Sequence, residues 1–207
     1  TAIGRQAMVA NTTADNNTAV GSQALENNTT GACNVAVGYN SLAANTTASF
    51  NAALGDSALL NNTTGTLNTA LGGVTLCQNT TGASNTAVGR QALRNNTTAS
   101  NNTAVGYQSL LCNTTGAQNV AVGALALDAN TTSNNNTAVG YNSLGVNTTG
   151  LENTAVGSQS LIANITGDKN TGIGKNALTS NTASLNTAVG RSALEANTTG
   201  TQNTAVG

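Results

Sequence analysis

The chain has 207 residues, of which 2% are aromatic and 6% are charged, and its formal net charge is −1 at pH 7. It lacks His, Trp and Pro. This composition argues against a globular core of large, varied side chains, and the absence of a basic patch argues against nucleic-acid binding. No apolar run reaches the ~18 residues that a membrane span requires.

A four-residue motif, Thr-Ala-Val-Gly or a close variant, recurs along the whole chain. Eleven of its twelve spacings are 17 residues, and the one between Thr171 and Thr187 is 16. This strict period predicts an all-β fold, a parallel β-solenoid (β-roll) of about twelve coils, as one continuous domain over residues 1–207. Disorder is the alternative for a polar, low-complexity chain, but the regularly placed Val and Leu argue against it. Neither end differs from the middle, so we expect a segment of a longer fibre.

Each coil is predicted to begin with a short strand, residues 17–21 in the second repeat. Side chains alternate along a strand, so Thr18 and Val20 share one face and Ala19 lies on the other. Valine replaces the threonine in two coils, so we expect the face of Thr18 and Val20 to be the interior. The small Ala19 then predicts the close approach of a neighbour or of another chain.

The next part of the coil, residues 22–25, is predicted to form a second strand or an extended corner. Gly21 is glycine in all thirteen motifs, which predicts a backbone angle or a close contact that a Cβ would forbid. Leu25 is leucine in eleven of twelve coils and is expected to fill the interior against Val20. A helix is the alternative, but about six residues before the following turn are too few for a stable one.

The coil is predicted to turn at Asn28-Thr29-Thr30-Gly31, where the glycine permits a left-handed conformation. An asparagine then closes the coil, and stacked copies of it are expected to form a hydrogen-bonded ladder. The ladder residues are Asn17, Asn34, Asn51, Asn68, Asn85, Asn102, Asn119, Asn136, Asn153, Asn170, Asn186 and Asn203.

The same Asn-Thr-Thr turn carries the acceptor pattern for N-glycosylation, Asn-Xaa-Thr. A carbohydrate coat would keep a weakly charged fibre soluble. The tandem threonines are alternative O-linked acceptors, for example Thr12, Thr13, Thr29 and Thr30, and a bare polar turn is the other interpretation. The candidate asparagines are Asn11, Asn28, Asn45, Asn62, Asn79, Asn96, Asn113, Asn130, Asn147, Asn164 and Asn197.

The string Asn-Thr-Ala-Val-Gly-Tyr-Gln-Ser-Leu at 102–110, with the Asn-Thr-Thr-Gly that follows, resembles repeats of bacterial surface fibres and phage tail-fibre-like proteins. It also resembles the heads of trimeric autotransporter adhesins. When their Ser-Val-Ala-Ile-Gly core is aligned with this string, its last four residues correspond to Thr103, Ala104, Val105 and Gly106. The resemblance implies a left-handed parallel β-roll, as a homotrimer, on the exterior of a cell or virion.

Three functions follow from this sequence. The first is an extracellular structural fibre, glycosylated at its turns, that self-associates. The second is an adhesin or tail-fibre shaft that presents a receptor-binding domain to a surface glycan or receptor through domains beyond this segment. The third is an ice-binding solenoid, because stacked threonines can order water.

No enzyme is expected, because the acids are scattered and there is no histidine to pair with a cysteine. No metal or cofactor is expected other than covalent glycans, and the cysteines are interpreted as small apolar residues that do not pair. One slot, directly after the glycine, holds both tyrosines and arginines and is therefore solvent-accessible. Its tyrosines are interpreted as surface packing and not as a stacking platform. The cysteines are Cys33, Cys77 and Cys112. The tyrosines and arginines of the slot are Tyr39, Tyr107, Tyr141, Arg5, Arg90 and Arg191.

Overall fold

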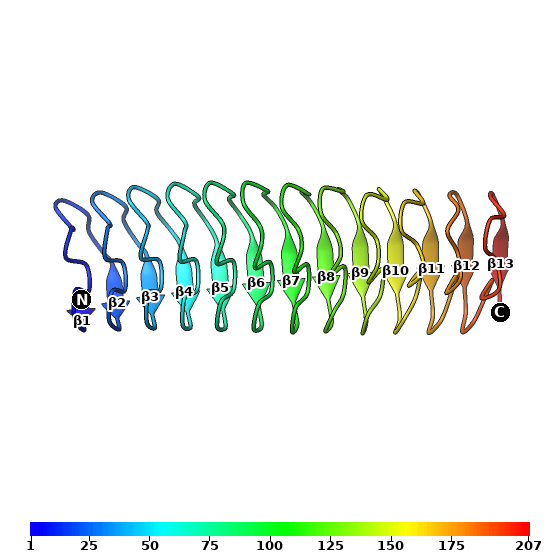
Figure 1. The fold of residues 1–207 in the computed structure, drawn as a ribbon, viewed down its shortest axis with the longest axis horizontal. Helices are drawn as coiled ribbons and strands as arrows, with labels where there is room; N and C mark the ends of the chain where they lie inside the picture. Colours follow the sequence, from blue (N-terminus) through cyan, green and yellow to red (C-terminus); the bar gives the residue numbers. More distant parts are fainter. The chain divides into compact units, whose positions relative to one another are not determined.

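Each repeat contributes one short strand, and tight turns carry the chain round to the next. The structure, a computed structural model, describes all residues from 1 to 207 and divides them into two compact units, Thr1–Asn102 and Thr103–Gly207. The chain is all-β, so the predicted parallel β-solenoid is confirmed, and it has no helix long and apolar enough to cross a membrane. The first unit contains β1 (Ala2–Ile3), β2 (Thr18–Val20), β3 (Val35–Val37), β4 (Ala52–Leu54), β5 (Thr69–Leu71) and β6 (Thr86–Val88). The second contains β7 (Thr103–Val105), β8 (Val120–Val122), β9 (Thr137–Val139), β10 (Thr154–Val156), β11 (Thr171–Ile173), β12 (Thr187–Val189) and β13 (Thr204–Val206) (Figure 1).

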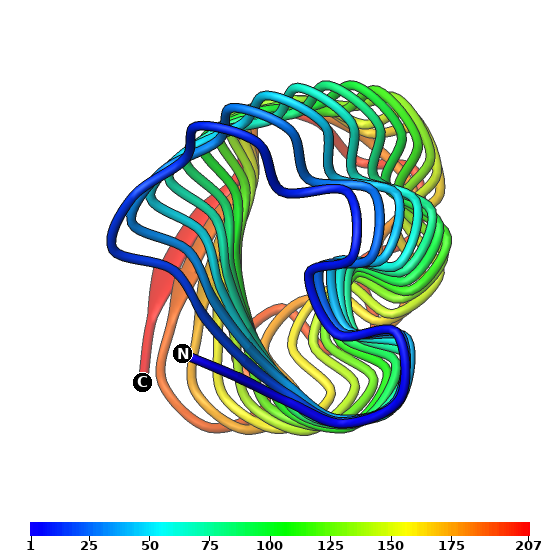
Figure 2. The ribbon, with the colours of Figure 1, turned by 90° about the vertical axis from the view of Figure 1, so that its left-hand side faces the viewer.

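Within each unit, neighbouring strands pair in parallel with motif aligned on motif. Between β2 and β3, Ala19 lies opposite Ala36 and Val20 lies opposite Val37. The amide of Ala19 donates to the carbonyl oxygen of Thr1 at 2.8 Å, one of the bonds that join β1 to β2. Successive coils of a unit follow nearly the same path when seen end-on, so the same side chains meet at every step (Figure 2).

The stretch after the glycine is a tight turn, and the predicted second strand or extended corner is wrong. Gln23 and Leu25 have φ angles of 60° and 52°, in the left-handed region. A non-glycine residue in this region costs roughly 1–2 kcal/mol. The amide of Leu25 donates to the carbonyl oxygen of Ser41 in the next coil at 2.9 Å, and such bonds between coils offset the strain. An extended segment could not reverse the chain within so few residues.

The alanine of each strand faces the interior, which is the opposite of the prediction. Ala19 and Leu25 are both 0% exposed, so the two side chains share the inside of the coil. Gly172 occupies the alanine position in one coil, and a Cβ built there would lie 2.6 Å from Oγ of Ser160 and 3.3 Å from Cγ of Leu161. The corner residues therefore leave room for only a small side chain on the strand, and the larger strand residues face outward.

Two positions of the repeat hold glycine for different reasons. Gly21 has a φ of 136°, and a Cβ there would collide with the carbonyl oxygen of Gly38, so both predicted reasons for glycine hold. Gly31 is not in the left-handed region, which corrects the prediction, and Ala48 takes its place in the next coil. A Cβ on Gly31 would collide with the carbonyl oxygen of Ala48 and lie 2.6 Å from Oδ1 of Asn28, so this position is confined by the next coil and by the asparagine.

Candidate functional site

The asparagine that opens each Asn-Thr-Thr turn lies inside the coil and forms a ladder that the sequence did not predict. Asn45 Nδ2 donates to Oδ1 of Asn28 at 2.8 Å and to the carbonyl oxygen of Ala48 at 3.0 Å. Asn62 repeats both bonds, to Asn45 at 3.1 Å and to Gly65 at 2.9 Å. The members that are 0% exposed are Asn28, Asn45, Asn62, Asn79, Asn96, Asn113, Asn130, Asn147 and Asn164.

An N-linked sugar replaces one hydrogen of Nδ2 and would displace one of these bonds in the folded coil. In Asn45 one hydrogen points at Asn28 of the preceding coil and the other at its own turn, so N-glycosylation at this turn stays a prediction. The two half-buried candidates are bonded as well. Asn11 Nδ2 donates to the carbonyl oxygen of Ala14 at 3.2 Å, and Asn197 Nδ2 donates to Oδ1 of Asn181 at 2.9 Å and to the carbonyl oxygen of Gly200 at 3.0 Å. The asparagine of the turn is therefore explained by its hydrogen bonds.

The two threonines of the turn have different surroundings. The hydroxyl of Thr29 donates to the carbonyl oxygen of Thr46 at 3.0 Å, and Thr12 makes the same bond to Thr29 at 3.0 Å. The second threonine, Thr30, is exposed, as is Thr13. An O-linked sugar at this second position stays a prediction.

The closing asparagines form a second ladder, on the residues where a ladder was expected. The amide nitrogen of Asn34 donates to Oδ1 of Asn17 at 2.8 Å. Asn17 Nδ2 donates to the carbonyl oxygen of Gly31 at 2.8 Å, and Asn34 Nδ2 donates to that of Ala48 at 2.8 Å. Each closing asparagine thus joins its own coil to a neighbour and ties the Asn-Thr-Thr turn to the strand.

The 16-residue coil interrupts the ladder of turn asparagines. Its turn, residues 181–183, reads Asn-Thr-Ala and lacks the second threonine. Asn181 Nδ2 donates to the carbonyl oxygen of Ala183 at 2.8 Å and does not reach the preceding rung. Oδ1 of that rung, Asn164, is buried without a hydrogen-bond partner. Such an unpaired buried acceptor is costly, so this coil is a weak point of the second unit.

The residues on either side of the inward alanine form what we call the outer strand face. Thr18 and Val20 belong to it, and both are half-buried, so the prediction that they line the interior is wrong. Leu54 and Ile173, at the position of Val20, are 49% and 40% exposed. The aliphatic row of this face is Ile3, Val20, Val37, Leu54, Leu71 and Val88 in the first unit, and Val105, Val122, Val139, Val156, Ile173, Val189 and Val206 in the second.

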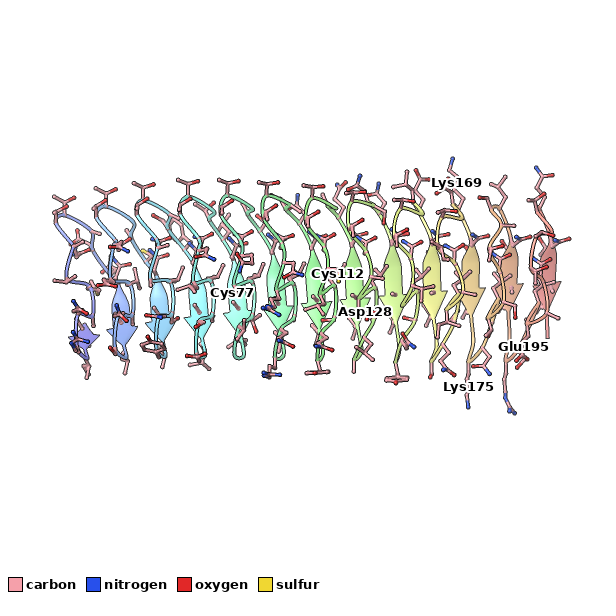
Figure 3. All side chains as sticks on the ribbon, viewed as in Figure 1. Cys77, Cys112, Asp128, Lys169, Lys175 and Glu195 are labelled. Carbon is pink, nitrogen blue, oxygen red and sulfur yellow. The ribbon has the colours of Figure 1, made fainter.

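The slot directly after the glycine is exposed wherever it holds an aromatic or an arginine. Its members there are Tyr39, Tyr107, Tyr141, Arg5, Arg90 and Arg191. The three cysteines are unpaired thiols. Burial raises the pKa of Cys77, and burial with the nearby carboxylate of Asp128 raises that of Cys112, so both thiols stay protonated at neutral pH (Figure 3).

The remaining observations concern ligands and relatives. The chain has no cluster of His, Cys, Asp or Glu that would hold a metal, and no pocket. No family model, curated protein or solved structure matches it. Function is therefore inferred from the surface that the coils present.

Proposed function

We propose that the protein is the structural shaft of an extracellular or virion-surface fibre, and that it self-associates through the outer strand face. One observation carries this proposal. An aliphatic side chain stands on the outward side of every strand, in register within each unit, next to a row made mostly of threonines. Contiguous apolar surface of this kind on a soluble protein marks an interaction site.

The scaffold suits such a role because one set of contacts repeats from coil to coil. The strand pairing, the leucine corner and both asparagine ladders bond each coil to the next within a unit. Adding a coil therefore lengthens the stack and extends the same face, which is the quasi-one-dimensional behaviour of solenoids.

The apolar face offers a free-energy gain of the same order as the cost of association. Covering a half-buried Val or Ile contributes about 1 kcal/mol, since full burial contributes about 1.5–3 kcal/mol. The second unit presents one such side chain on each of its strands, β7 to β13. Two copies meeting face to face would gain on the order of 10 kcal/mol, which lies within the roughly 4–15 kcal/mol cost of association.

The resemblance to trimeric adhesin heads and tail-fibre repeats supports a homotrimer outside the cell. It also supports the alternative role, a shaft that positions a receptor-binding domain. The two roles differ in what lies beyond the repeats. A full-length chain whose receptor binding resides outside the coils would favour the second.

The test is analytical ultracentrifugation of wild type and of two charge variants with matched positions. Val122→Lys with Val139→Lys places charges on the outer strand face. Thr132→Lys with Thr149→Lys places the same charges on the exposed turns of the same two coils. We expect wild type and the turn variant to sediment as the same discrete oligomer, and the face variant as a folded monomer by circular dichroism. A monomeric wild type at every concentration contradicts the proposal, and so does an equal loss in both variants.

A second function, ice binding, is favoured by one feature of the same face. Thr137, Thr154, Thr171 and Thr187 pair in register on consecutive strands and present a regular row of outward hydroxyl and methyl groups. Thermal hysteresis that disappears in Thr154→Lys, but persists in the turn variant Thr149→Lys, would support it. Hysteresis absent from wild type would dismiss it.

A further inference from the structure

The slot after the glycine forms a row of exposed side chains along the second unit, which we call the post-glycine row. Tyr107 and Tyr141 are 47% and 53% exposed, so about half of each side chain reaches solvent. Further along the same row, Lys175 and Arg191 are exposed on consecutive coils, and Figure 3 shows Lys175 projecting away from the ribbon. The full row reads Tyr107, Ala124, Tyr141, Ser158, Lys175 and Arg191.

Backbone hydrogen bonds fix the spacing of this row. The amide of Leu125 donates to the carbonyl oxygen of Tyr107 at 3.0 Å, and that of Asn142 donates to the carbonyl oxygen of Ala124 at 3.0 Å. Each coil therefore advances by one strand spacing, about 4.8 Å. The two tyrosines are two coils apart, roughly 9.6 Å, and only the methyl group of Ala124 lies between them in the row.

The cations follow at a fixed distance on the same row. The amides of Gln159 and Asn176 donate to the carbonyl oxygens of Tyr141 and Ser158 at 2.9 and 3.1 Å, which places Lys175 two coils, roughly 9.6 Å, beyond Tyr141. Arg191 follows one coil later. Lys175 and Arg191 form no ion pair with a carboxylate of this chain, although Glu195 lies in the same coil as Arg191.

We propose that the post-glycine row of the second unit binds an acidic polysaccharide that lies along the stack of coils. The distance between the tyrosines is close to the length of two sugars in an extended β-1,4-linked chain. Alternate sugars would place their apolar C–H faces on the two rings, which offer apolar area together with a hydroxyl. The carboxylates of later sugars would pair with Lys175 and Arg191, the guanidinium in bidentate fashion. This binding depends on neither the oligomer nor the shaft role.

A nucleic acid fits the row less well. Single strands bind in grooves of many cations, with successive bases stacked on aromatic side chains. Here the net charge is −1, the row carries two cations, and two coils separate its rings. An extended polysaccharide with one carboxylate on each sugar matches both the ring spacing and the modest charge.

The experiment is isothermal titration calorimetry of the whole chain with poly-β-1,4-mannuronate, with neutral β-1,4-mannan as the matched polymer. Tyr107→Ala with Tyr141→Ala removes the rings, and Lys175→Ala with Arg191→Ala removes the cations. Tyr39→Ala is the control. This exposed tyrosine occupies the same slot in the first unit, but the next coil carries Asp56 there, which would repel an acidic polymer.

We expect wild type to bind the acidic polymer at least tenfold more tightly than the neutral one. The double tyrosine variant should lose at least tenfold in affinity for both polymers. The double cation variant should bind the two polymers equally, and its binding should no longer weaken with salt. The Tyr39→Ala variant should bind like wild type. Three outcomes overturn the proposal: no binding by wild type, equal loss in Tyr39→Ala, or tighter binding of a single-stranded oligonucleotide than of the acidic polymer.

Discussion

Replacing one rung of the turn-asparagine ladder tests whether these residues act through hydrogen bonds in the interior. The side chain of Asn62 donates a hydrogen bond to Oδ1 of Asn45 at 3.1 Å and accepts one from Nδ2 of Asn79 at 2.8 Å, and Asn62→Ala removes both. The carbonyl oxygen of Gly65 keeps a second donor, Asn51 Nδ2, at 2.9 Å. The substitution therefore orphans two buried groups, one acceptor and one N–H.

The short coil supplies an internal comparison for this magnitude. Asn164 donates to Asn147 Oδ1 at 3.1 Å, but its own Oδ1 has no partner. The carbonyl oxygen of Gly167 keeps Asn153 Nδ2 at 2.8 Å, so Asn164→Ala orphans one group. Each orphaned group costs about 1–3 kcal/mol. Asn164→Ala also removes the unpaired Oδ1 of Asn164 itself, so the group it orphans and the group it removes nearly cancel. We expect about 4 kcal/mol for Asn62→Ala and about 0 kcal/mol for Asn164→Ala, each before a cavity cost that is similar in both.

The assay is equilibrium unfolding in urea, with hydrogen exchange to locate the loss of protection. Thr64→Ala, an exposed threonine in the same turn as Asn62, is the control and should change stability by less than about 0.5 kcal/mol. Equal losses for the two asparagine variants, or a loss for Asn62→Ala no larger than for the control, would refute the reasoning.

Three further predictions address the backbone, the short coil and one buried acid. Gly72→Ala should lower the unfolding free energy in urea by more than about 2 kcal/mol, because the φ of Gly72 is 131° and a Cβ there would lie 2.8 Å from the backbone of the next coil. The adjacent Gly73→Ala, whose Cβ would have no contact closer than 3.9 Å, should be neutral or slightly stabilising. A threonine inserted between Thr182 and Ala183 should raise the unfolding free energy by about 1–2 kcal/mol, since the orphaned Oδ1 of Asn164 regains a donor; a lower value would contradict this origin of the weak point. Burial raises the pKa of Asp128, so this carboxyl stabilises the fold below its ordinary pKa, and that contribution is lost as the pH rises through the pKa of the folded state. In urea unfolding Asp128→Asn should therefore be more stable than wild type at neutral pH but not in acid. The opposite order would show that the carboxylate is favourably paired.

The sequence was sufficient to predict the solenoid because its period reports a contact that repeats in space. The 17-residue spacing, the glycine of each motif and the leucine of each corner all indicate identical coils, and the structure has one parallel strand for each. The inward leucine followed from its recurrence as the largest apolar side chain of the coil. These signals depend on spacing and size, which a single sequence displays directly.

The direction of each strand side chain was harder to predict, because alternation gives two faces and does not say which is inside. Valine at some threonine positions suggested an apolar interior, but those valines lie on the outer strand face. The interior is too narrow for them once Leu25 is in place, so Ala19 faces it. The volume of the corner residue decided the orientation, and that volume constraint became visible only when the turn geometry was known.

The role of the turn asparagine was hard to predict because one pattern serves two chemistries. Asn-Xaa-Thr is an acceptor sequence, and in this chain its asparagine is also a rung of a buried amide ladder, next to the bonded hydroxyl of the middle threonine. One signal was present in the sequence. At Asn164 the middle threonine is replaced by Ile165 while the asparagine stays, which fits a structural amide as well as it fits an acceptor.

The central claim is that the outer strand face meets another copy of the chain. The most direct measurement is disulfide trapping in a background where the three native cysteines are replaced by alanine. Under mild oxidation Val139→Cys should give covalently linked chains on a non-reducing gel, whereas Thr149→Cys, on the exposed turn of the same coil, should remain single. Linked chains from Thr149→Cys but not from Val139→Cys would show that the chains meet elsewhere and would contradict the account.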